Sequence, residues 1–394
     1  MLKKLLICLF FWVACRPDPP PTPTIPSPTP YQLTLTPSPV LRPTPMTAPA
    51  TPTPVKITSH CGEQFQVAQK QWQPAYTPSN SGVQSLHIRS LFMGREVLWV
   101  GYAAGIGLGY FDGKFWGFCR QFAHINTLLE DTDGRLWVGT DSGNELTHSG
   151  GLWVFHENEW KNWTDSLPDH RIYRIRQFQH TVYVATWKGM AAYNLESQTW
   201  SQPYLPADSI HWEAIHDFLI LEDEAWFGSI SHGLSWLHEA EWFAVTAPDS
   251  SQPSSFEVLD SNQVRVISLT PDGEKVWIGS DVLSEDHELV GLILYNRVSD
   301  QWRKLSSPDN RVMDIKFDSS GRAWIATLSA TFFLGEDEVW YDVGVYWPSL
   351  SLAFGCAQNC AFSEEYLFVA TGGNGLMHVG VPQHVKDMQI ARQP

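Results

Sequence analysis

The sequence has little positive charge. Its 394 residues include 26 Lys and Arg against 42 Asp and Glu, which gives a formal net charge of −16 at pH 7. General nucleic-acid binding needs a cationic surface against phosphate, so this balance argues against that class of function. It favours an acidic, self-repelling particle.

Long hydrophobic runs are scarce as well. The clearest one, Leu5 to Ala14, has ten residues and follows the basic residues Lys3 and Lys4. It is too short for a membrane span, and its flanks are typical of a secretory signal peptide. We expect residues 1–14 to be removed, which changes the net charge to 24 − 42 = −18.

The end of this segment resembles a bacterial lipobox. Small Ala14 precedes Cys15, although Trp12 stands where the pattern prefers Leu. The resemblance implies that Cys15 is lipidated and anchors an exported protein to the membrane; a plain secreted protein is the alternative. Residues 15–56 would then form a tether, because residues 17–54 hold 15 of the 27 prolines and favour extended polyproline II structure.

Beyond Cys15, the expected mature chain has few cysteines, namely Cys61, Cys119, Cys356 and Cys360. An exported protein meets an oxidising compartment, so disulfides are allowed, but four cysteines permit three pairings and the sequence does not choose among them. The spacing of Cys356 and Cys360 is not that of zinc or thioredoxin motifs. We therefore expect neither a metal nor a redox cofactor.

A short strand motif recurs along the rest of the chain. Its aromatic residue is found at Trp99, Trp137, Tyr183, Trp226, Trp277, Trp324 and Phe368, at intervals of 38 to 51 residues. Periods in the forties are typical of four-stranded propeller blades. A second series marks a later strand of each unit, at Trp72, Trp116, Trp160, Trp200, Trp242, Trp302 and Trp340. Both series are expected to fill the wedges between blades.

These series predict an all-β fold, a seven-bladed β-propeller of four-stranded antiparallel blades over residues 57–381, followed by a tail at 382–394. Trp72 precedes the first copy of the inner motif, and no such Trp follows Phe368. The N-terminal segment should therefore complete the last blade as its outer strand, which removes exposed sheet edges. Residues 62–72 and 375–380 are both candidates for the third strand of that blade.

The stretch Ile125–Thr140, "INTLLEDTDGRLWVGT", with "GGLWVF" after it, resembles the two-component regulator propeller repeat. That repeat builds sensor ectodomains of bacterial hybrid histidine kinases, many of which sense glycans. The resemblance implies a ligand-holding propeller. The sequence shows no kinase or transmembrane helix, so we do not expect a phosphorelay in this chain. Its Asp-Gly turns are interpreted as hairpin chemistry rather than calcium loops.

A ring of cationic and histidine side chains is the main candidate site. Six blades place such a residue at the start of the innermost strand, where the loops surround the channel mouth: His87, His124, Arg171, His211, Arg265 and Arg311. The same alignment puts Cys356 there in the seventh blade. On an acidic protein this ring predicts an anion site for a uronate, sulfate or phosphate group. Capping of the strand entries is the alternative.

Further side chains could contact a ligand at the same face. Short loops present Trp187 and His232, and Trp212 lies beside the ring position. An exposed Trp near polar groups suits stacking on a sugar ring, while packing at the rim is the alternative for Trp187. The long loops at 141–151 and 281–291 carry acidic and His residues, which we interpret as solvated surface rather than a metal site.

The sequence therefore favours a non-catalytic binding or sensory module for a carbohydrate or other anionic ligand. It shows no nucleophile elbow, no HExxH motif and no phosphate-cradling glycine loop. Because propeller active sites collect single residues from many blades, a lyase or hydrolase using His87, His124 and His211 remains an alternative. A scaffold that binds a protein partner through a flat apolar patch is another.

Overall fold

The computed structural model describes residues 60–61, 65–68, 75–141, 150–201, 214–238, 241–246, 259, 261–281, 291–309, 311–355 and 366–380. The chain divides into two compact units, Met1–Pro52 and Thr53–Pro394, and every described residue belongs to the second. The expected signal peptide, Cys15 and the tether lie outside the described residues. Within the described ranges no helix is long and apolar enough to cross a membrane.

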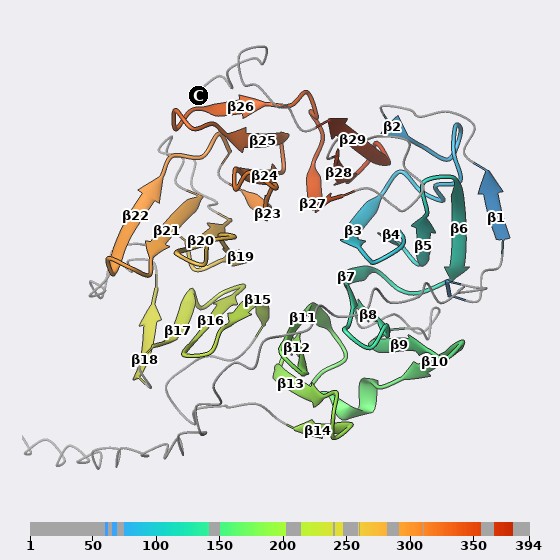
Figure 1. Ribbon diagram of the computed structural model, residues 1–394, viewed down its shortest axis with the longest axis horizontal. Coiled ribbons are helices and arrows are strands. Elements are labelled where there is room, and N and C mark those ends of the chain that lie inside the picture. The colour runs from blue at the N-terminus through green and yellow to red at the C-terminus, as the bar shows by residue number, and fades with distance from the viewer. Residues whose placement is uncertain are drawn as a thin grey trace, which may run out of the picture. The chain divides into compact units, whose positions relative to one another are not determined.

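The second unit is a ring of seven antiparallel sheets, as predicted (Figure 1). The innermost strands are β3 (Ile88–Met93), β7 (Ile125–Glu130), β11 (Ile172–Phe178), β15 (Ile215–Ile220), β19 (Val264–Leu269), β23 (Val312–Phe317) and β27 (Ser349–Phe354). The second strands are β4 (Leu98–Tyr102), β8 (Leu136–Thr140), β12 (Thr181–Thr186), β16 (Glu224–Ser229), β20 (Lys275–Ser280), β24 (Ala323–Thr327) and β28 (Tyr366–Thr371).

The outer half of each blade follows the same order. The third strands are β5 (Leu108–Phe111), β9 (Leu152–His156), β13 (Gly189–Asn194), β17 (Leu234–His238), β21 (Leu292–Asn296), β25 (Thr331–Leu334) and β29 (Leu376–Gly380). The outer strands are β6 (Phe115–Arg120), β10 (Glu159–Asn162), β14 (Thr199–Ser201), β18 (Glu241–Val245), β22 (Gln301–Leu305), β26 (Trp340–Asp342) and β2 (Ala75–Tyr76). A 3₁₀ turn, η1 (Thr164–Ser166), follows β10.

The small residue after "WV" in the repeated strand has a packing cause. A Cβ added to Gly139 would lie 2.6 Å from a methyl carbon of Ile172, the first residue of the next inner strand. Gly228 stands in the same relation to Val264, at 2.5 Å. At these two positions even a methyl group would press on the neighbouring blade, and the corresponding residue of the other blades is never larger than Ala.

The core lies in the wedges between blades, as the periodic aromatic residues predicted. Trp137 of β8 is fully buried and packs with Val182 and Tyr193 of the next blade. Its ring centroid lies 5.6 Å from that of Tyr193 and 6.3 Å from that of Trp200 in the outer strand β14. Deleting such a side chain typically costs about 3–5 kcal/mol. The described members of both aromatic series lie in such hydrophobic clusters and are therefore structural.

The last blade takes strands from both ends of the described chain. Its sheet order is β2-β29-β28-β27, and Ala75 pairs with Met377 while Tyr76 pairs with Leu376. The outer strand thus comes from the N-terminal side and the third strand from the C-terminal side, which settles the choice that the sequence left open. Trp72 lies outside the described residues.

The other N-terminal candidate strand has a different partner. Strand β1 (Phe65–Ala68) pairs with β6, as a fifth strand on the outside of the first blade. Next to it, a disulfide joins Cys61 to Cys119 of β6, across a sequence separation of 58 residues. Cys356 and Cys360 lie outside the described residues. The N-terminal segment is therefore attached to the first blade before it completes the last one.

Candidate functional site

Every innermost strand carries a β-bulge at its second residue. In all seven pairings of a first strand with a second strand, the register shifts between the first and third residues of the inner strand. The bulged residues are Arg89, Asn126, Tyr173, His216, Arg265, Met313 and Leu350. A bulge leaves one residue unpaired and turns its side chain away from the regular pleat. Here the repeat directs one side chain per blade toward the centre of the ring.

These seven side chains line one central cavity of about 380 Å³, together with residues further along the same strands. The wall is not uniform. In the first five blades the bulged residues are polar or charged, whereas Met313 and Leu350 occupy this position in the sixth and seventh; Lys316 of the sixth blade lines the cavity further along its strand. At the level of the bulges, a ligand would meet polar groups on one side and hydrocarbon on the other.

The residue after the bulge ties neighbouring blades together. The amide of Ile175 donates to Thr127 Oγ1 of the preceding blade at 3.2 Å, and the amide of Leu91 donates to Ser351 Oγ at 3.2 Å. Two blades use a carboxylate in this role. Asp217 and Asp314 are therefore buried acids with a structural task, and buried acids require compensating cations.

Asp217 is fully buried and has two cationic partners. Its Oδ2 accepts from the Ile267 amide at 3.0 Å, and Arg176 Nη2 donates to both oxygens at 2.8 and 2.9 Å. Arg174 Nε lies 3.0 Å from Oδ1. Burial alone would raise the pKa of Asp217, but Arg174 and Arg176 outweigh it and lower the pKa below its usual value. One carboxylate here pairs with two guanidinium groups.

Asp314 has a weaker cationic partner. Its Oδ2 accepts from the Leu352 amide at 2.9 Å, and Lys316 Nζ lies 3.9 Å from its Oδ1. Asp314 alone would raise the pKa of Lys316, but burial, with Arg176 and Arg174 nearby, lowers it below the usual value. The ammonium group is therefore held among other cations.

Two arginines of the predicted ring share one carboxylate. Asp281 Oδ2 accepts from Arg265 Nη2 at 2.7 Å, and Arg311 Nε lies 3.3 Å from Asp281 Oδ1. The backbones of Asp281 and Arg311 also form an isolated antiparallel bridge. The carboxylate neutralises one of the two guanidinium charges and leaves the other.

Among the described residues, Arg89 is the cation of the site with the least direct neutralisation by a carboxylate. Its Nε donates to Asn126 Oδ1 at 2.6 Å, and Asn126 in turn donates to the Ile172 carbonyl at 2.8 Å. The side chain is exposed to the channel, yet the surrounding protein removes enough hydration to lower its pKa, and Arg265 lowers it further while Asp141 opposes this. A neutral amide, not a carboxylate, orients this guanidinium.

His216 is a neutral group among these cations. Its Nδ1 lies 2.9 Å from the Arg265 carbonyl, and its ring stacks on Tyr173 at 5.3 Å. Burial first, then the charges of Arg265 and Arg174, lower its pKa to about 4. At pH 7 the Nδ1–H therefore donates to the carbonyl, and Nε2 carries a lone pair.

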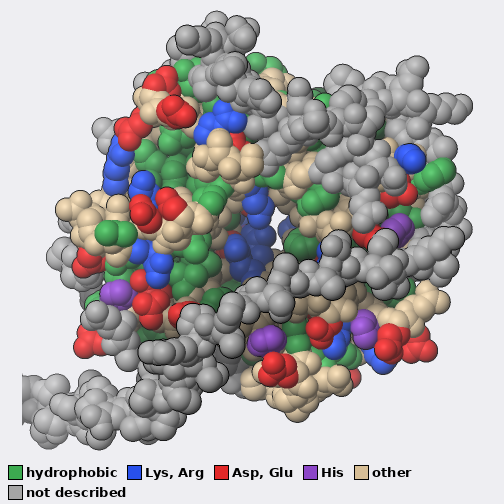
Figure 2. Space-filling view, in the orientation of Figure 1, with side chains coloured by type: hydrophobic (Ala, Val, Ile, Leu, Met, Phe, Trp, Pro, Cys, Tyr) green, Lys and Arg blue, Asp and Glu red, His purple; other side chains and the backbone are tan. Residues whose placement is uncertain are grey.

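The described site has a surplus of positive charge. Its cations are Arg89, Arg174, Arg176, Arg265, Arg311 and Lys316, and its nearby carboxylates are Asp141, Asp217, Asp281 and Asp314. Six minus four leaves +2, in a chain whose net charge is −16. Figure 2 shows Lys and Arg side chains gathered at the central hollow, while acidic side chains are scattered over the blades. The arrangement can hold an anion.

The predicted ring of mouth residues is only partly formed. His87, His124, Arg171 and Arg311 directly precede β3, β7, β11 and β23, and the two histidines are exposed. Arg265 differs, because it is the bulged residue of β19 and lies two positions further along the register. His211 and Trp212 lie outside the described residues.

The predicted register therefore needs correction in three blades, because the sequence pattern does not mark the first residue of an inner strand. The residue before the inner strand is Ala214 in the fourth blade, Gln263 in the fifth and Pro348 in the seventh. The innermost strand of the seventh blade, β27, ends at Phe354, so Cys356 comes after this strand instead of before it. Cys356 itself lies outside the described residues.

The structure places the other predicted contact residues at the rim. Trp187 is half-buried, and the guanidinium carbon of Arg171 lies 4.8 Å from its ring centroid. His232 Nδ1 lies 2.8 Å from Ser231 Oγ, in the short turn between β16 and β17. Trp187 thus packs on Arg171.

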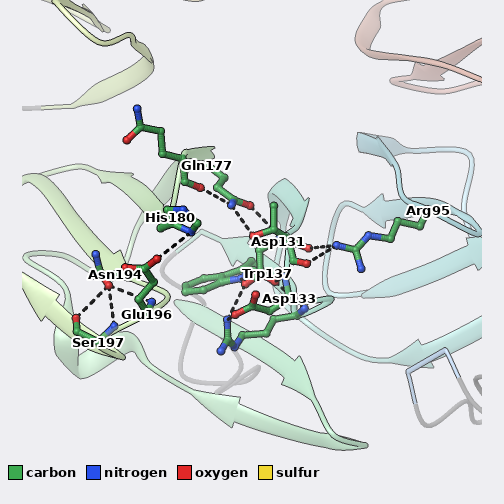
Figure 3. Close-up of polar contacts among 12 residues, drawn as sticks. Arg95, Asp131, Asp133, Trp137, Gln177, His180, Asn194, Glu196 and Ser197 are labelled. Atoms are coloured by element: carbon green, nitrogen blue, oxygen red, sulfur yellow. Dashed lines mark hydrogen bonds and ion pairs between the residues drawn. The ribbon is translucent and has the colours of Figure 1, made fainter. Parts of the chain in front are cut away.

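The carboxylate of the acidic turn at Asp131 forms hydrogen bonds within its own hairpin (Figure 3). Asp131 Oδ2 accepts from the Trp137 indole at 2.8 Å and its Oδ1 from the amides of Asp133 and Arg135, each at 2.9 Å. Gln177 of the next blade forms hydrogen bonds to the amide and the hydroxyl of Thr132, which link this turn to the neighbouring blade. Among the described residues, no group of three or more His, Cys, Asp or Glu side chains is placed to hold a metal ion.

Most of the channel wall could not be predicted from the sequence. Arg265 was predicted, whereas Arg89, Arg174, Lys316 and His216 were not, because the bulge that directs side chains into the channel has no sequence signature of its own. One signal was available: a charged residue lies one or two positions inside the inner strand in several blades, where the repeat otherwise has apolar or small residues.

Comparisons with known proteins support the propeller fold and its repeat. Residues 121–142 match the family model described as two component regulator propeller, so the second blade carries the repeat that the sequence resembled. The extracellular domain of a protein described as the one component system BT4673 from B. thetaiotaomicron has a TM-score of 0.55 at 14% identity. The extracellular domain of the hybrid two component system BT3049 from the same organism has a TM-score of 0.53 at 16% identity.

The coverage limits what these likenesses show. They span 79% and 74% of this chain but only 40% and 39% of those chains, so this chain covers about two fifths of their length. The WD40 β-propeller domain of Doa1 is also similar, with a TM-score of 0.52 at 12% identity, covering 82% of this chain and 99% of that chain. Likeness at this identity shows the fold alone. No curated protein matches the sequence.

Proposed function

We propose that this chain is an exported, lipid-anchored binding module that holds an anionic ligand in its central channel without transforming it. The ligand is a small molecule or glycan that carries a carboxylate, sulfate or phosphate group. The lipobox-like Cys15 and the likeness to extracellular sensor domains support an extracytoplasmic, sensory role. The repeat in the second blade supports the same class.

One observation carries the proposal: the described charged groups in and beside one cavity carry a surplus of +2, in an otherwise acidic protein. A cavity walled by protein concentrates the field of its charges and strengthens charge-assisted hydrogen bonds. Arg89 is the group best suited to meet the ligand, because it is held by Asn126 and not by a carboxylate. Arg174 and Arg265 would add further donors, although each already shares a carboxylate.

The alternatives receive less support. An enzyme needs an acid and a base that reach the same bond. His87 and His124 are exposed on separate blades, His211 lies outside the described residues, and His216 donates to a backbone carbonyl. No observation in the described residues favours a lyase or hydrolase.

The test uses the mature chain with Cys15→Ser, which keeps it free of lipid. Thermal shift is measured with tetragalacturonate, a sulfated tetrasaccharide, inorganic sulfate and neutral cellotetraose. Binding to the folded state raises the Tm by mass action. A ligand concentration of 100 times the Kd adds about 2.7 kcal/mol to the free energy of unfolding. We expect shifts with the anions and none with cellotetraose.

A matched pair of variants locates the site. Arg89→Gln removes a charged hydrogen bond worth about 1.5–3 kcal/mol, so anion affinity should fall tenfold or more. Arg303→Gln, on the outer strand β22 and paired with Glu338, removes the same charge at the surface. Anion binding that is unchanged in Arg89→Gln, or equally weakened in both variants, would contradict the channel site.

A further inference from the structure

Exposed apolar side chains gather at one part of the channel rim. Among the described residues, five large hydrophobic side chains are exposed, and three of them are Leu86, Tyr346 and Trp347. Tyr346 and Trp347 precede β27 of the seventh blade, while Leu86 precedes β3 of the first. These starts of neighbouring inner strands lie at the same end of the propeller. The cluster is therefore local and is not scattered surface hydrophobicity.

A turn almost without side chains connects the two parts of this cluster. The Gly375 amide donates to the Leu86 carbonyl at 2.8 Å, and the Gly372 amide donates to the Pro348 carbonyl at 2.8 Å. The backbone of Gly372 also pairs with that of His87. The backbones of the seventh and first blades thus lie side by side at the rim, with glycine between them.

The glycines leave the indole of Trp347 uncovered. A Cβ added to Gly373 would meet the Trp347 ring at 3.6 and 3.7 Å, which is ordinary contact distance. Trp347 itself remains 44% exposed. The rim thus combines a flat aromatic ring, bare backbone and the exposed imidazole of His87. An indole beside polar groups suits the C–H face of a sugar ring, whose hydroxyls need polar partners nearby.

The rim continues into the cavity. Leu350, three residues after Trp347, lines the apolar part of the wall, and a Cβ on Gly372 would lie 3.7 Å from its Cδ1. Arg89, two residues after His87, lines the polar part. Three residues of extended chain span at most about 10 Å, the length of a disaccharide. One ligand could therefore contact the rim and the cations together.

We propose that the rim formed by Trp347, Gly372, Gly373 and His87 is a sugar-binding subsite. One pyranose ring of an acidic oligosaccharide stacks on Trp347 while its charged group enters the channel toward Arg89. This rests on the proposed function, since it assumes that the channel binds an anion. It narrows the ligand from anions in general to acidic glycans.

The test compares two probes on the mature Cys15→Ser chain by calorimetry. Inorganic sulfate reports on the channel alone, and tetragalacturonate or a sulfated tetrasaccharide reports on the channel and rim together. Trp347→Ala should lower the affinity for whichever tetrasaccharide binds by about tenfold, because a stacking contact with one sugar ring is lost. It should leave the affinity for sulfate unchanged. Trp347→Tyr should restore most of the loss, because it retains a stacking ring. Arg89→Gln should weaken both probes.

Phe115→Ala is the matched control. Phe115 is 40% exposed but begins the outer strand β6, at the opposite end of its blade. It should leave both affinities unchanged. Saturation-transfer NMR on the bound tetrasaccharide adds a direct readout, in which one ring's C–H protons receive magnetisation from the protein and lose it in Trp347→Ala.

The outcomes separate the two proposals. If Trp347→Ala binds the tetrasaccharide as tightly as the parent chain does, or if sulfate binds and neither tetrasaccharide binds more tightly, the rim subsite is wrong and the channel site stands. If neither sulfate nor either tetrasaccharide binds, the proposed function fails and the subsite fails with it. Equal losses in Trp347→Ala and Phe115→Ala would indicate a general effect on the fold and overturn the subsite.

Discussion

At the scale of single residues, the buried acids of the channel have two roles at once. Asp217 accepts the Ile267 amide of the next blade, and the same carboxylate holds Arg174 and Arg176 at the cavity wall. A blade-to-blade hydrogen bond thus recruits the cations that a ligand would meet. The carboxylates that join the blades therefore also fix the positions of the channel cations.

Asp217→Ala should destabilise the fold strongly. It leaves the Ile267 amide without its acceptor and two guanidinium groups without their carboxylate, and breaking a buried pair costs about 3–5 kcal/mol. Asp217→Asn retains an acceptor oxygen and should cost less. Urea unfolding measures both. Glu338→Ala removes an exposed arginine partner and should leave the midpoint unchanged; an Asp217→Ala midpoint as high as that of Glu338→Ala would contradict the structural role.

His216 should make stability depend on pH in a defined window. Its pKa is about 4 in the folded chain and 6.5 in the reference state, so between these values the unfolded chain binds more protons. Stability from this group is full above pH 6.5 and falls as the pH drops toward 4, by on the order of 2–3 kcal/mol.

Comparison with His216→Gln isolates this contribution, because the amide can still donate to the Arg265 carbonyl. Unfolding free energies of both chains are measured from pH 7 to pH 4. The parent should lose more stability over this range than the variant. Parallel curves would show that His216 does not titrate as its surroundings require.

At the scale of elements, the sequence was sufficient for the strands and insufficient for the register at the channel. The recurring aromatic residue, followed two positions later by Gly or Ala, placed the second strand of every blade; at Gly139 and Gly228 the close approach of Ile172 and Val264 explains the small residue. The bulge has no such signature. It is a backbone feature that leaves the hydrophobic pattern nearly intact, so the inward-pointing residues could not be predicted. Arg265 was placed two positions from its true register because a shift of two residues keeps the alternation of a strand, and the apolar pattern of "VRVISL" fits both placements.

The closure of the ring was likewise predictable only in part. The Trp series out of step with the inner motif predicted an N-terminal outer strand, and β2 pairs with β29. The role of β1 could not be derived, because "FQVA" is as suitable for the third strand of the last blade as for the edge of the first. Tertiary pairing and the Cys61–Cys119 disulfide decided between them.

This disulfide should contribute strongly to stability. It closes a loop of 58 residues between Cys61 and Cys119, for which the chain-entropy model gives about 4 kcal/mol. The double variant Cys61→Ala, Cys119→Ala should therefore melt at a lower temperature than the parent. Reducing agent should lower the Tm of the parent toward that of the variant.

The double variant serves as its own control for other thiols. Reduction should change its Tm little, since the bond in question is already missing. If reduction lowers the Tm of the variant as much as that of the parent, the stabilising bond lies elsewhere in the chain. Equal Tm values for oxidised parent and variant would show that β1 needs no covalent attachment.

At the scale of the whole molecule, charge is separated between the inside and the outside. The channel collects a surplus of +2 while the mature chain is expected to carry −18. Such a particle repels anions at long range and attracts them at the channel, where the described cations outnumber the carboxylates. Salt screens the repulsion over about 10 Å at 0.1 M, whereas enclosed pairs are screened less. Anion binding should therefore tolerate moderate salt better than an open basic patch would.

The membrane attachment expected for Cys15 can be tested on the intact chain. Lipid chains supply about 0.8 kcal/mol per buried CH₂ group, and two chains suffice for stable anchoring. In a bacterial host the parent chain should fractionate with membranes and require detergent for release, while Cys15→Ser should appear in the soluble exported fraction. Cys8→Ser, which changes the other cysteine of the N-terminal segment, should behave as the parent does. Membrane retention of Cys15→Ser would assign the attachment to another feature, and a soluble parent chain would favour plain secretion.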